Sequence, residues 1–191
     1  MDKPEKGKYS KFSDEHLMMS VHHGDVFAFN ELYNRYSKRL LYYFYRMLGS
    51  SQEKSRDFLQ DIFIKVIERP ELFDTKRKFS TWIFSVAHNM CKNEYRRMAV
   101  RSNTVNEANA GQYSEVDEVY LLDRQLTADQ IFKEIDHLEE TEKSAFILYY
   151  REDFSIQEIG KILDLPEGTV KSKLFYARKK LANKLQIQGF K

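Results

Sequence analysis

Cysteine, proline and glycine are all scarce in this sequence. Its 191 residues include one cysteine, three prolines and seven glycines. The single cysteine, Cys91, excludes an intramolecular disulfide and favours a reducing, cytoplasmic setting. Because Leu, Lys, Glu and Arg are common, the composition favours helices joined by short turns.

Long apolar runs and enzyme motifs are also missing. No stretch of about 18 apolar residues occurs, so we predict no membrane insertion. The polar residues 1–11 lack the apolar centre of a secretion signal. No Gly-rich phosphate loop and no Ser/His/Asp arrangement with useful spacing is present, so we expect no cofactor, no small-molecule substrate and no catalytic centre. His88 and Cys91 could form half of a metal site, but without a matching pair we expect no metal.

Charge is segregated along the chain, although the formal net charge is only +2. Residues 75–101 carry a net charge of +6, residues 102–123 carry −5, and residues 166–191 carry +6. Two basic blocks separated by an acidic strip suit a protein with two surfaces for a polyanion. A solvated basic surface is the plainer alternative.

Apolar periodicity predicts a series of amphipathic helices. In the first half they cover residues 12–21, about 29–47, 52–68 and 80–98. In the second half they cover about 119–138, 141–150 and 156–163, with one more starting at Pro166. We therefore predict an all-α protein with two small helical domains joined by a flexible acidic linker. The expected boundaries are a polar tail (1–12), a first domain (13–99), the linker (100–123) and a second domain (124–191).

The second domain contains a pattern typical of a helix-turn-helix. Ser155 and Glu158 form a capping box, and we expect Gly160 to let a neighbouring helix approach closely. On the next helix a buried stripe is predicted at Val170, Leu174, Ala177 and Leu181. On the side of the helix away from this stripe, cations lie on both flanks of a polar strip. A helix that enters a major groove needs this arrangement. A packed helical hairpin with a solvated face is the alternative. The flanking residues are Lys171, Arg178, Lys173 and Lys180.

The stretch "FSIQEIGKILDLPEGTVKSKLFYARKKL" closely resembles the promoter −35 reading region of the extracytoplasmic function (ECF) group of bacterial sigma factors. Asp164 departs from the Gly often found in such turns, but Asp tolerates a left-handed backbone at some cost. The resemblance implies that −35 DNA is contacted by Thr169, Lys171, Ser172, Lys173, Phe175, Tyr176, Arg178 and Lys179.

Two further stretches resemble sigma region 2, the domain that binds polymerase and the −10 element. "GDVFAFNELYNRYSKRLLYYFYRML" resembles its first conserved helix, and "SRDFLQDIFIKVIE" resembles the helix that grips the clamp helices of RNA polymerase. The polar positions of that second helix match Asp57, Gln60 and Asp61, and a solvated face is the alternative. Ile67 stands where the family usually has an aromatic residue.

The stretch "FSTWIFSVAHNMCKNEYRR" resembles the segment that binds the −10 element as single-stranded DNA. Basic side chains there suit an electrostatic track for one strand, and amide side chains suit hydrogen bonds to unstacked bases. The predicted −10 contacts are Lys76, Arg77, Lys78, Asn89, Lys92, Asn93, Arg96 and Arg97. Trp82 suits a stacking platform, but a lone Trp beside Ile83 and Val86 is more often part of the core.

The resemblance implies a transcription initiation factor rather than an enzyme. Such a subunit binds core RNA polymerase through the β′ clamp helices and the β flap, reads promoter DNA and aids melting. An anti-sigma factor is the family's usual partner, and it can hold the otherwise cytoplasmic protein at the membrane. The acidic linker suits either a nucleic-acid mimic in the polymerase channel or a soluble tether. The alternatives are a conventional helix-turn-helix transcriptional regulator of duplex operators without polymerase, a polymerase-docking regulator that reads no DNA, and an enzyme with an appended DNA-binding module.

Overall fold

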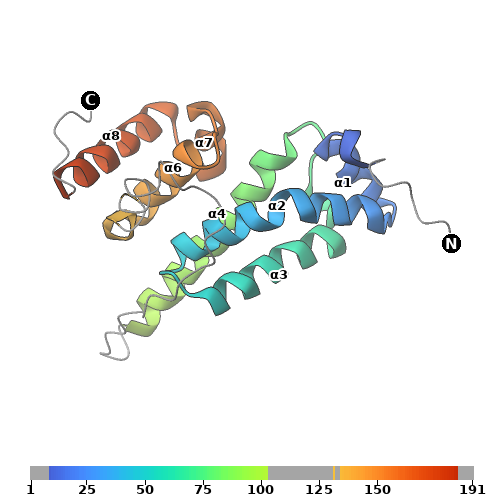
Figure 1. Ribbon diagram of the computed structural model, residues 1–191, viewed down its shortest axis with the longest axis horizontal. Helices are drawn as coiled ribbons and strands as arrows, with labels where there is room; N and C mark the ends of the chain where they lie inside the picture. Colours follow the sequence, from blue (N-terminus) through green and yellow to red (C-terminus); the bar gives the residue numbers. More distant parts are fainter. Residues whose placement is uncertain (1–8, 103–130, 132–133, 185–191) are drawn as a thin grey trace, which may run out of the picture.

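The computed structural model describes residues 9–102, 131 and 134–184, and only helices and turns occur within these ranges. Figure 1 shows two groups of helices side by side. The N-terminal module, residues 9–102, contains the 3-10 turns Tyr9–Lys11 and Pro70–Leu72 and the helices α1 (Asp14–His22), α2 (Val26–Met47), α3 (Gln52–Glu68) and α4 (Phe79–Ser102). The C-terminal module, the described residues from 131 on, contains the 3-10 turn Ile135–His137 and the helices α6 (Glu140–Tyr150), α7 (Ile156–Leu163) and α8 (Glu167–Lys184). The prediction of an all-α protein with two helical domains is confirmed. None of the helices in the described ranges is long and apolar enough to cross a membrane.

Side-chain caps set the starts of the first three helices. Ser13, Asp25 and Ser51 each accept hydrogen bonds from backbone N–H groups in the first turn that follows. Gly49 and Ser50 both have positive φ, at 67° and 60°, so the chain turns sharply between α2 and α3. These boundaries agree with the predicted helices to within a few residues.

Helix α4 continues farther than predicted. It ends at Ser102, so residues 100–102 belong to the helix and not to the linker. Loss of apolar periodicity does not end a helix by itself, because each added residue gains a backbone hydrogen bond once the helix is nucleated. The rest of the predicted linker, and most of the helix predicted over 119–138, lie outside the described residues.

The helices of the N-terminal module bury a core rich in aromatic rings. Tyr43, Phe44, Phe79 and Phe84 are fully buried. Trp82 is partly buried and packs against Phe73 and Phe79, with ring centroids 5.3 and 5.5 Å away, which supports its assignment to the core. Ile67, which stands where the family usually has an aromatic residue, lies at the edge of the apolar stripe of α3 and is 52% exposed.

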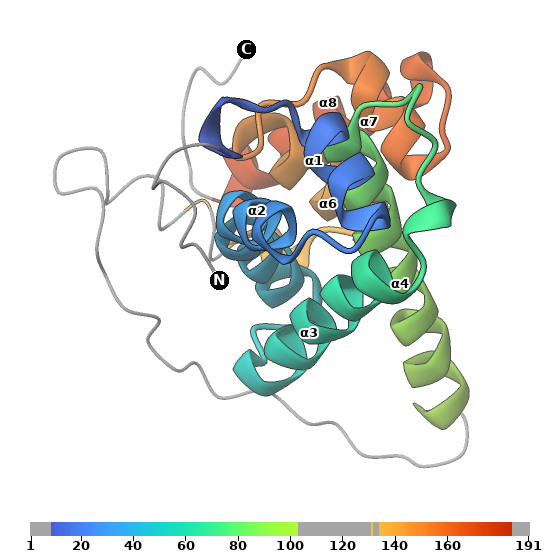
Figure 2. The same ribbon diagram turned by 90° about the vertical axis from the view of Figure 1, so that its right-hand side faces the viewer.

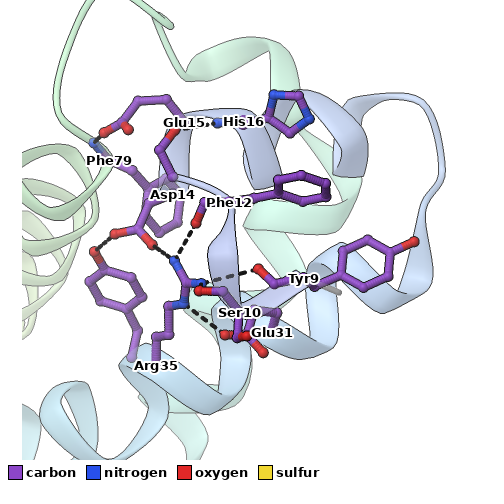
Figure 3. A network of polar contacts seen from close by, with 11 residues as sticks. Tyr9, Ser10, Phe12, Asp14, Glu15, His16, Glu31, Arg35 and Phe79 are labelled. Atoms are coloured by element: carbon purple, nitrogen blue, oxygen red, sulfur yellow. Dashed lines mark hydrogen bonds and ion pairs between the residues drawn. The ribbon is translucent and has the colours of Figure 1, made fainter. Parts of the chain in front are cut away.

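Arg35 of α2 joins the start of the chain to the bundle (Figure 3). Its guanidinium donates to the carboxylates of Asp14 and Glu31 at 2.6 and 2.8 Å, and to the carbonyl oxygen of Phe12 at 2.9 Å. The neighbouring Glu15 accepts a hydrogen bond from the backbone N–H of Phe79 at 2.9 Å. Helix α1 therefore fixes the position at which α4 begins.

The helix-turn-helix is formed by α7 and α8. The capping box is confirmed, because the backbone N–H of Glu158 donates to the Ser155 hydroxyl at 3.2 Å and the backbone N–H of Ser155 donates to the Glu158 carboxylate at 3.0 Å. Asp164 has the left-handed backbone that its position predicts, with φ 54° and ψ 52°. The predicted stripe on α8 is buried in full, at Val170, Leu174, Ala177 and Leu181.

The explanation offered for Gly160 was wrong. A β-carbon at this position would lie 2.8 Å from the backbone carbonyl oxygen of Leu165, which is part of the turn and not of a neighbouring helix. The Leu165 N–H also donates to the Gly160 carbonyl oxygen at 2.9 Å. The glycine therefore makes room for the returning chain of the turn itself.

The two modules share a buried interface that the sequence did not predict. Helix α7 packs on α4, and α6 packs on α2 (Figures 1 and 2). The rings of Phe84 and Phe154 meet with centroids 5.2 Å apart. The hydroxyls of Tyr43 and Ser144 share a hydrogen bond of 2.7 Å. Apolar and polar contacts thus both join the modules.

Candidate nucleic-acid interface

An acidic ridge runs along the exposed side of α3. It consists of Asp57, Gln60 and Asp61, all of which are exposed. The opposite side of the helix, with Leu59, Ile62, Phe63 and Val66, is buried in the core and fixes which side faces outward. Neither Asp57 nor Asp61 forms an ion pair with another described residue, so the ridge can receive a basic partner.

Two apolar side chains on the same helix are exposed, Ile64 and Ile67, and their exposure was not predicted from the sequence. Ile64 is 39% exposed and Ile67 is 52% exposed. Helical spacing places Ile64 three residues after Asp61, so an apolar patch borders the ridge. Apolar side chains next to charged ones are typical of surfaces that bind protein partners.

The predicted −10 cations occupy two neighbouring elements. Lys76, Arg77 and Lys78 are exposed in the loop before α4, where the backbone N–H of Lys76 donates to the Asp74 carboxylate at 3.0 Å. The other cations are exposed along α4. We call this set the cationic track, and it comprises Lys76, Arg77, Lys78, Lys92, Arg96 and Arg97.

Helix α4 presents its amides beside the cations. Asn89 and Asn93 are exposed one turn apart, and Arg96 follows on the same side of the helix. Tyr95, on another side, donates a hydrogen bond to the backbone carbonyl oxygen of Met47 in α2. The packing of α4 on the core therefore leaves the polar side of the helix outward.

Helix α8 exposes most of the predicted −35 contacts. Lys171, Ser172, Phe175, Tyr176 and Lys179 are exposed, with Phe175 and Tyr176 at 59% and 53%. The Ser172 hydroxyl donates to the Gly168 carbonyl oxygen at 3.0 Å. Thr169 is half-buried at the start of the helix.

Three of the four cations on the flanks of α8 are held by α6 and its preceding turn. Lys173 pairs with Glu139 at 3.1 Å, and Lys180 pairs with Glu142 at 2.7 Å. The guanidinium of Arg178 lies over the rings of Tyr149 and Tyr150, 5.9 and 5.5 Å from their centroids. These side chains brace the helix-turn-helix, so Lys171 and Lys179 are the predicted cations that project most freely.

Acidic side chains of the C-terminal module lie against the cationic track. The Lys78 ammonium is 2.7 Å from the Glu158 carboxylate. That hydrogen bond and those from Ser155 lower the pKa of Glu158 to about 2. Burial raises the pKa of Glu140, while the nearby cations Lys92 and Arg96 act in the opposite direction. Both acids thus face cations that were predicted to bind DNA.

His88 and Cys91 are buried beneath the same surface. Burial lowers the pKa of His88 to about 4, with a smaller contribution from Lys92, and burial raises the pKa of the Cys91 thiol. The Nδ1 atom of His88 lies 3.4 Å from the hydroxyls of both Tyr43 and Ser144. Within residues 9–102, 131 and 134–184 no cluster of three or more metal-binding side chains occurs.

The family models of Sigma-70 region 2 and Sigma-70, region 4 match residues 32–101 and 128–181. The chain is 31% identical over 186 residues to the ECF RNA polymerase sigma-E factor of Escherichia coli (strain K12), covering 92% of this chain and 96% of that protein. It is 29% identical over 178 residues to the ECF RNA polymerase sigma factor SigW of Bacillus subtilis (strain 168), covering 87% and 93%.

Two solved structures have a similar fold. One is the sigma factor RpoE from Bartonella quintana in complex with the anti-sigma factor NepR, with a TM-score of 0.66 and 21% identity over 84% of this chain and 98% of that chain. The other is CnrH in complex with the cytosolic domain of CnrY, with a TM-score of 0.67 and 20% identity over 92% and 99%.

Proposed function

Because this chain belongs to the ECF sigma factors of RNA polymerase, we propose that it is a transcription initiation subunit that binds core RNA polymerase and directs it to specific promoters. The N-terminal module captures −10 bases as single-stranded DNA and helps to keep the strands apart. The C-terminal module reads the −35 duplex. The subunit contributes sequence preference and performs no bond chemistry of its own.

The observation that carries this proposal is the acidic ridge on α3 within the same module as the cationic track. Asp57, Gln60 and Asp61 are exposed on a helix that the predicted DNA contacts do not use. A regulator that only binds duplex DNA has no need for such a ridge, because its carboxylates repel the phosphates. A basic surface on the polymerase clamp is the partner that the ridge suits, and Ile64 and Ile67 add apolar area beside it.

Each DNA surface has a chemistry that suits its element. The cationic track suits the phosphates of one strand, and Asn89 and Asn93 can hydrogen-bond to an unstacked base. On α8, Lys171 and Lys179 suit the phosphate walls of a major groove. The exposed rings of Phe175 and Tyr176 lie between these cations on the same helix and suit apolar contact with base edges.

The remaining partners follow from the same proposal. The C-terminal module also docks on the β flap of the polymerase, and an anti-sigma factor covers the DNA-binding and polymerase-binding surfaces. One solved structure of similar fold, the sigma factor RpoE from Bartonella quintana, was determined in complex with the anti-sigma factor NepR, which supports this partner. Since bacterial polymerase and chromosome lie in the cytoplasm, the proposal places the chain there.

Core binding and promoter-directed transcription test the function directly. We expect the full chain to co-purify with core polymerase and to direct initiation at promoters mapped after its overproduction. Asp61→Arg should weaken core binding at least about 30-fold, because losing one partner of an interfacial charge pair costs roughly 2–5 kcal/mol. Glu71→Arg, an equal charge change at an exposed position outside α3, is the matched control. A chain that never joins core, or joins it without initiating anywhere, would refute the proposal.

A further inference from the structure

We propose that Glu15 of α1 is a positioning residue for −10 recognition, because its carboxylate caps the N-terminus of α4 and holds the preceding loop in place. That loop, residues 74–78, carries the first three cations of the cationic track. The proposal rests on the proposed function. It gives α1, which contains none of the predicted DNA contacts, a part in reading DNA.

The residue before α4 cannot cap this helix. It is Lys78, whose side chain carries only hydrogen-bond donors, so it offers no acceptor to the backbone N–H groups of the first turn. The acceptor comes from 64 residues earlier in the chain, where Glu15 Oε1 lies 2.9 Å from the backbone nitrogen of Phe79 (Figure 3). A carboxylate also suits the positive end of the helix dipole.

Helix α1 is anchored independently of the Glu15 side chain. The neighbouring Asp14 pairs with Arg35 of α2 at 2.6 Å and accepts a hydrogen bond from the Tyr36 hydroxyl. On the other side of α1, Leu17 and Met18 are buried in the core. Loss of the Glu15 carboxylate should therefore leave α1 in place and remove only the cap on α4.

The loop is a tight turn whose two ends meet beside the start of α4. The rings of Phe73 and Phe79 lie with their centroids 5.5 Å apart. Between them, the backbone N–H of Arg77 donates to the Asp74 carbonyl oxygen at 2.9 Å. Because Lys78 directly precedes Phe79, the position of the first turn of α4 sets the direction in which the loop cations project.

The ring of Phe79 has packing partners that do not involve Glu15. It lies 5.2 and 5.5 Å from the ring centroids of Tyr36 and Trp82, and the residue is fully buried. Removing the carboxylate thus keeps the core but deprives the Phe79 N–H of its acceptor, which favours fraying of the first turn. Phosphate contacts fix the register of a strand, and base contacts read it. A displaced loop would therefore shift the strand relative to Asn89 and Asn93.

Base discrimination by the holoenzyme tests the proposal. Core polymerase carrying the full chain is titrated with two fluorescent single-stranded oligonucleotides. One has the non-template sequence of a mapped −10 element, and the other has the same bases shuffled. The ratio of the two affinities measures recognition, and a chain that is only less stable loses active protein equally in both titrations. We expect Glu15→Ala to lower this ratio about tenfold, because the loss of a helix cap changes an equilibrium by about that factor.

Two variants separate the cap from the charge and from the anchor of α1. Glu15→Gln loses the charge but keeps an oxygen that can accept from the Phe79 N–H, so its ratio should stay within about twofold of wild type. Glu31→Ala removes the same charge from a carboxylate whose partner is Arg35, at 2.8 Å, and it should also keep the ratio. The proposal is wrong if Glu15→Ala keeps the wild-type ratio, or if either control lowers the ratio as much as Glu15→Ala does.

A milder change covers the case in which Glu15→Ala unfolds the chain, seen as lost helical circular dichroism. Glu15→Asp keeps the charge in the first turn of α1 but is one methylene shorter, so its carboxylate falls short of the Phe79 N–H and the ratio should fall about threefold. In that case an unchanged ratio in Glu15→Asp would overturn the proposal. If the wild-type holoenzyme discriminates and loss of the cap has no effect, the positioning role is wrong and the proposed function stands. If the wild-type holoenzyme does not discriminate between the strands, the proposed function itself is wrong.

Discussion

Acid should destabilise this protein through one buried histidine. His88 is 5% exposed, and burial lowers its pKa from 6.5 to about 4. Its Nδ1 atom faces the hydroxyls of Tyr43 in the N-terminal module and Ser144 in the C-terminal module, so a neutral ring with its proton on Nε2 can accept a hydrogen bond from one of them. Protonation would remove that acceptor and place a charge in the interface between the modules.

The sign and size of the effect follow from the pKa difference. Between pH 6.5 and pH 4 the unfolded chain binds a proton at His88 that the folded chain does not, so the free energy of unfolding falls as pH falls. At about 1.4 kcal/mol per pKa unit the full loss approaches about 3 kcal/mol, and the loss between pH 7 and pH 5 is about 2 kcal/mol. Burial raises the pKa values of Glu140 and Glu152. A raised carboxyl pKa increases the free energy of unfolding as pH falls, so this gain is subtracted from the loss at His88.

Urea unfolding followed by circular dichroism at pH 7, 6 and 5 measures this loss. His88→Asn keeps an acceptor near the position of Nδ1 but does not titrate. It should therefore lose about 2 kcal/mol less than wild type between pH 7 and pH 5. His22→Asn, at an exposed histidine of α1, should follow the wild-type curve. Equal losses in wild type and His88→Asn would refute the reasoning, because the carboxylates are common to both proteins.

Two further predictions concern the helix-turn-helix. Asp164→Gly should raise the free energy of unfolding, measured by urea titration, by about 0.5–1 kcal/mol. A left-handed backbone costs a non-Gly residue roughly 1–2 kcal/mol, and the larger conformational entropy that glycine loses on folding cancels part of this gain. A loss of stability would show that the Asp side chain supports the turn. The slope of log K against log salt concentration, for binding to a duplex with the mapped −35 element, should become shallower by about 0.9 in Lys171→Ala. Lys173→Ala should reduce this slope by less, because Glu139 already holds the Lys173 ammonium. Titrations at several salt concentrations compare the two, and an equal or larger effect at Lys173 would contradict the assignment.

Local rules were sufficient wherever a few neighbouring residues decide the structure. The capping box at Ser155, the left-handed Asp164 and the buried stripe from Val170 to Leu181 follow from short-range spacing, and all three are present. The same rules did not predict the role of Gly160 or the exposure of Ile67. A β-carbon at Gly160 would lie 2.8 Å from the Leu165 carbonyl oxygen, a contact that exists only once the turn is formed, and Ile67 is 52% exposed although the adjacent Val66 is fully buried.

The sequence by itself determined the helices, the division into two modules, the two basic blocks and the resemblance that predicted the family. Each of these depends on periodicity, composition or a motif that is continuous in the chain. Only the tertiary structure decided which cations are free and which are paired. Lys78 meets Glu158 and Arg39 meets Glu152 across 80 and 113 residues of chain. Pairing of side chains that far apart depends on how two finished modules dock, and no local pattern encodes that.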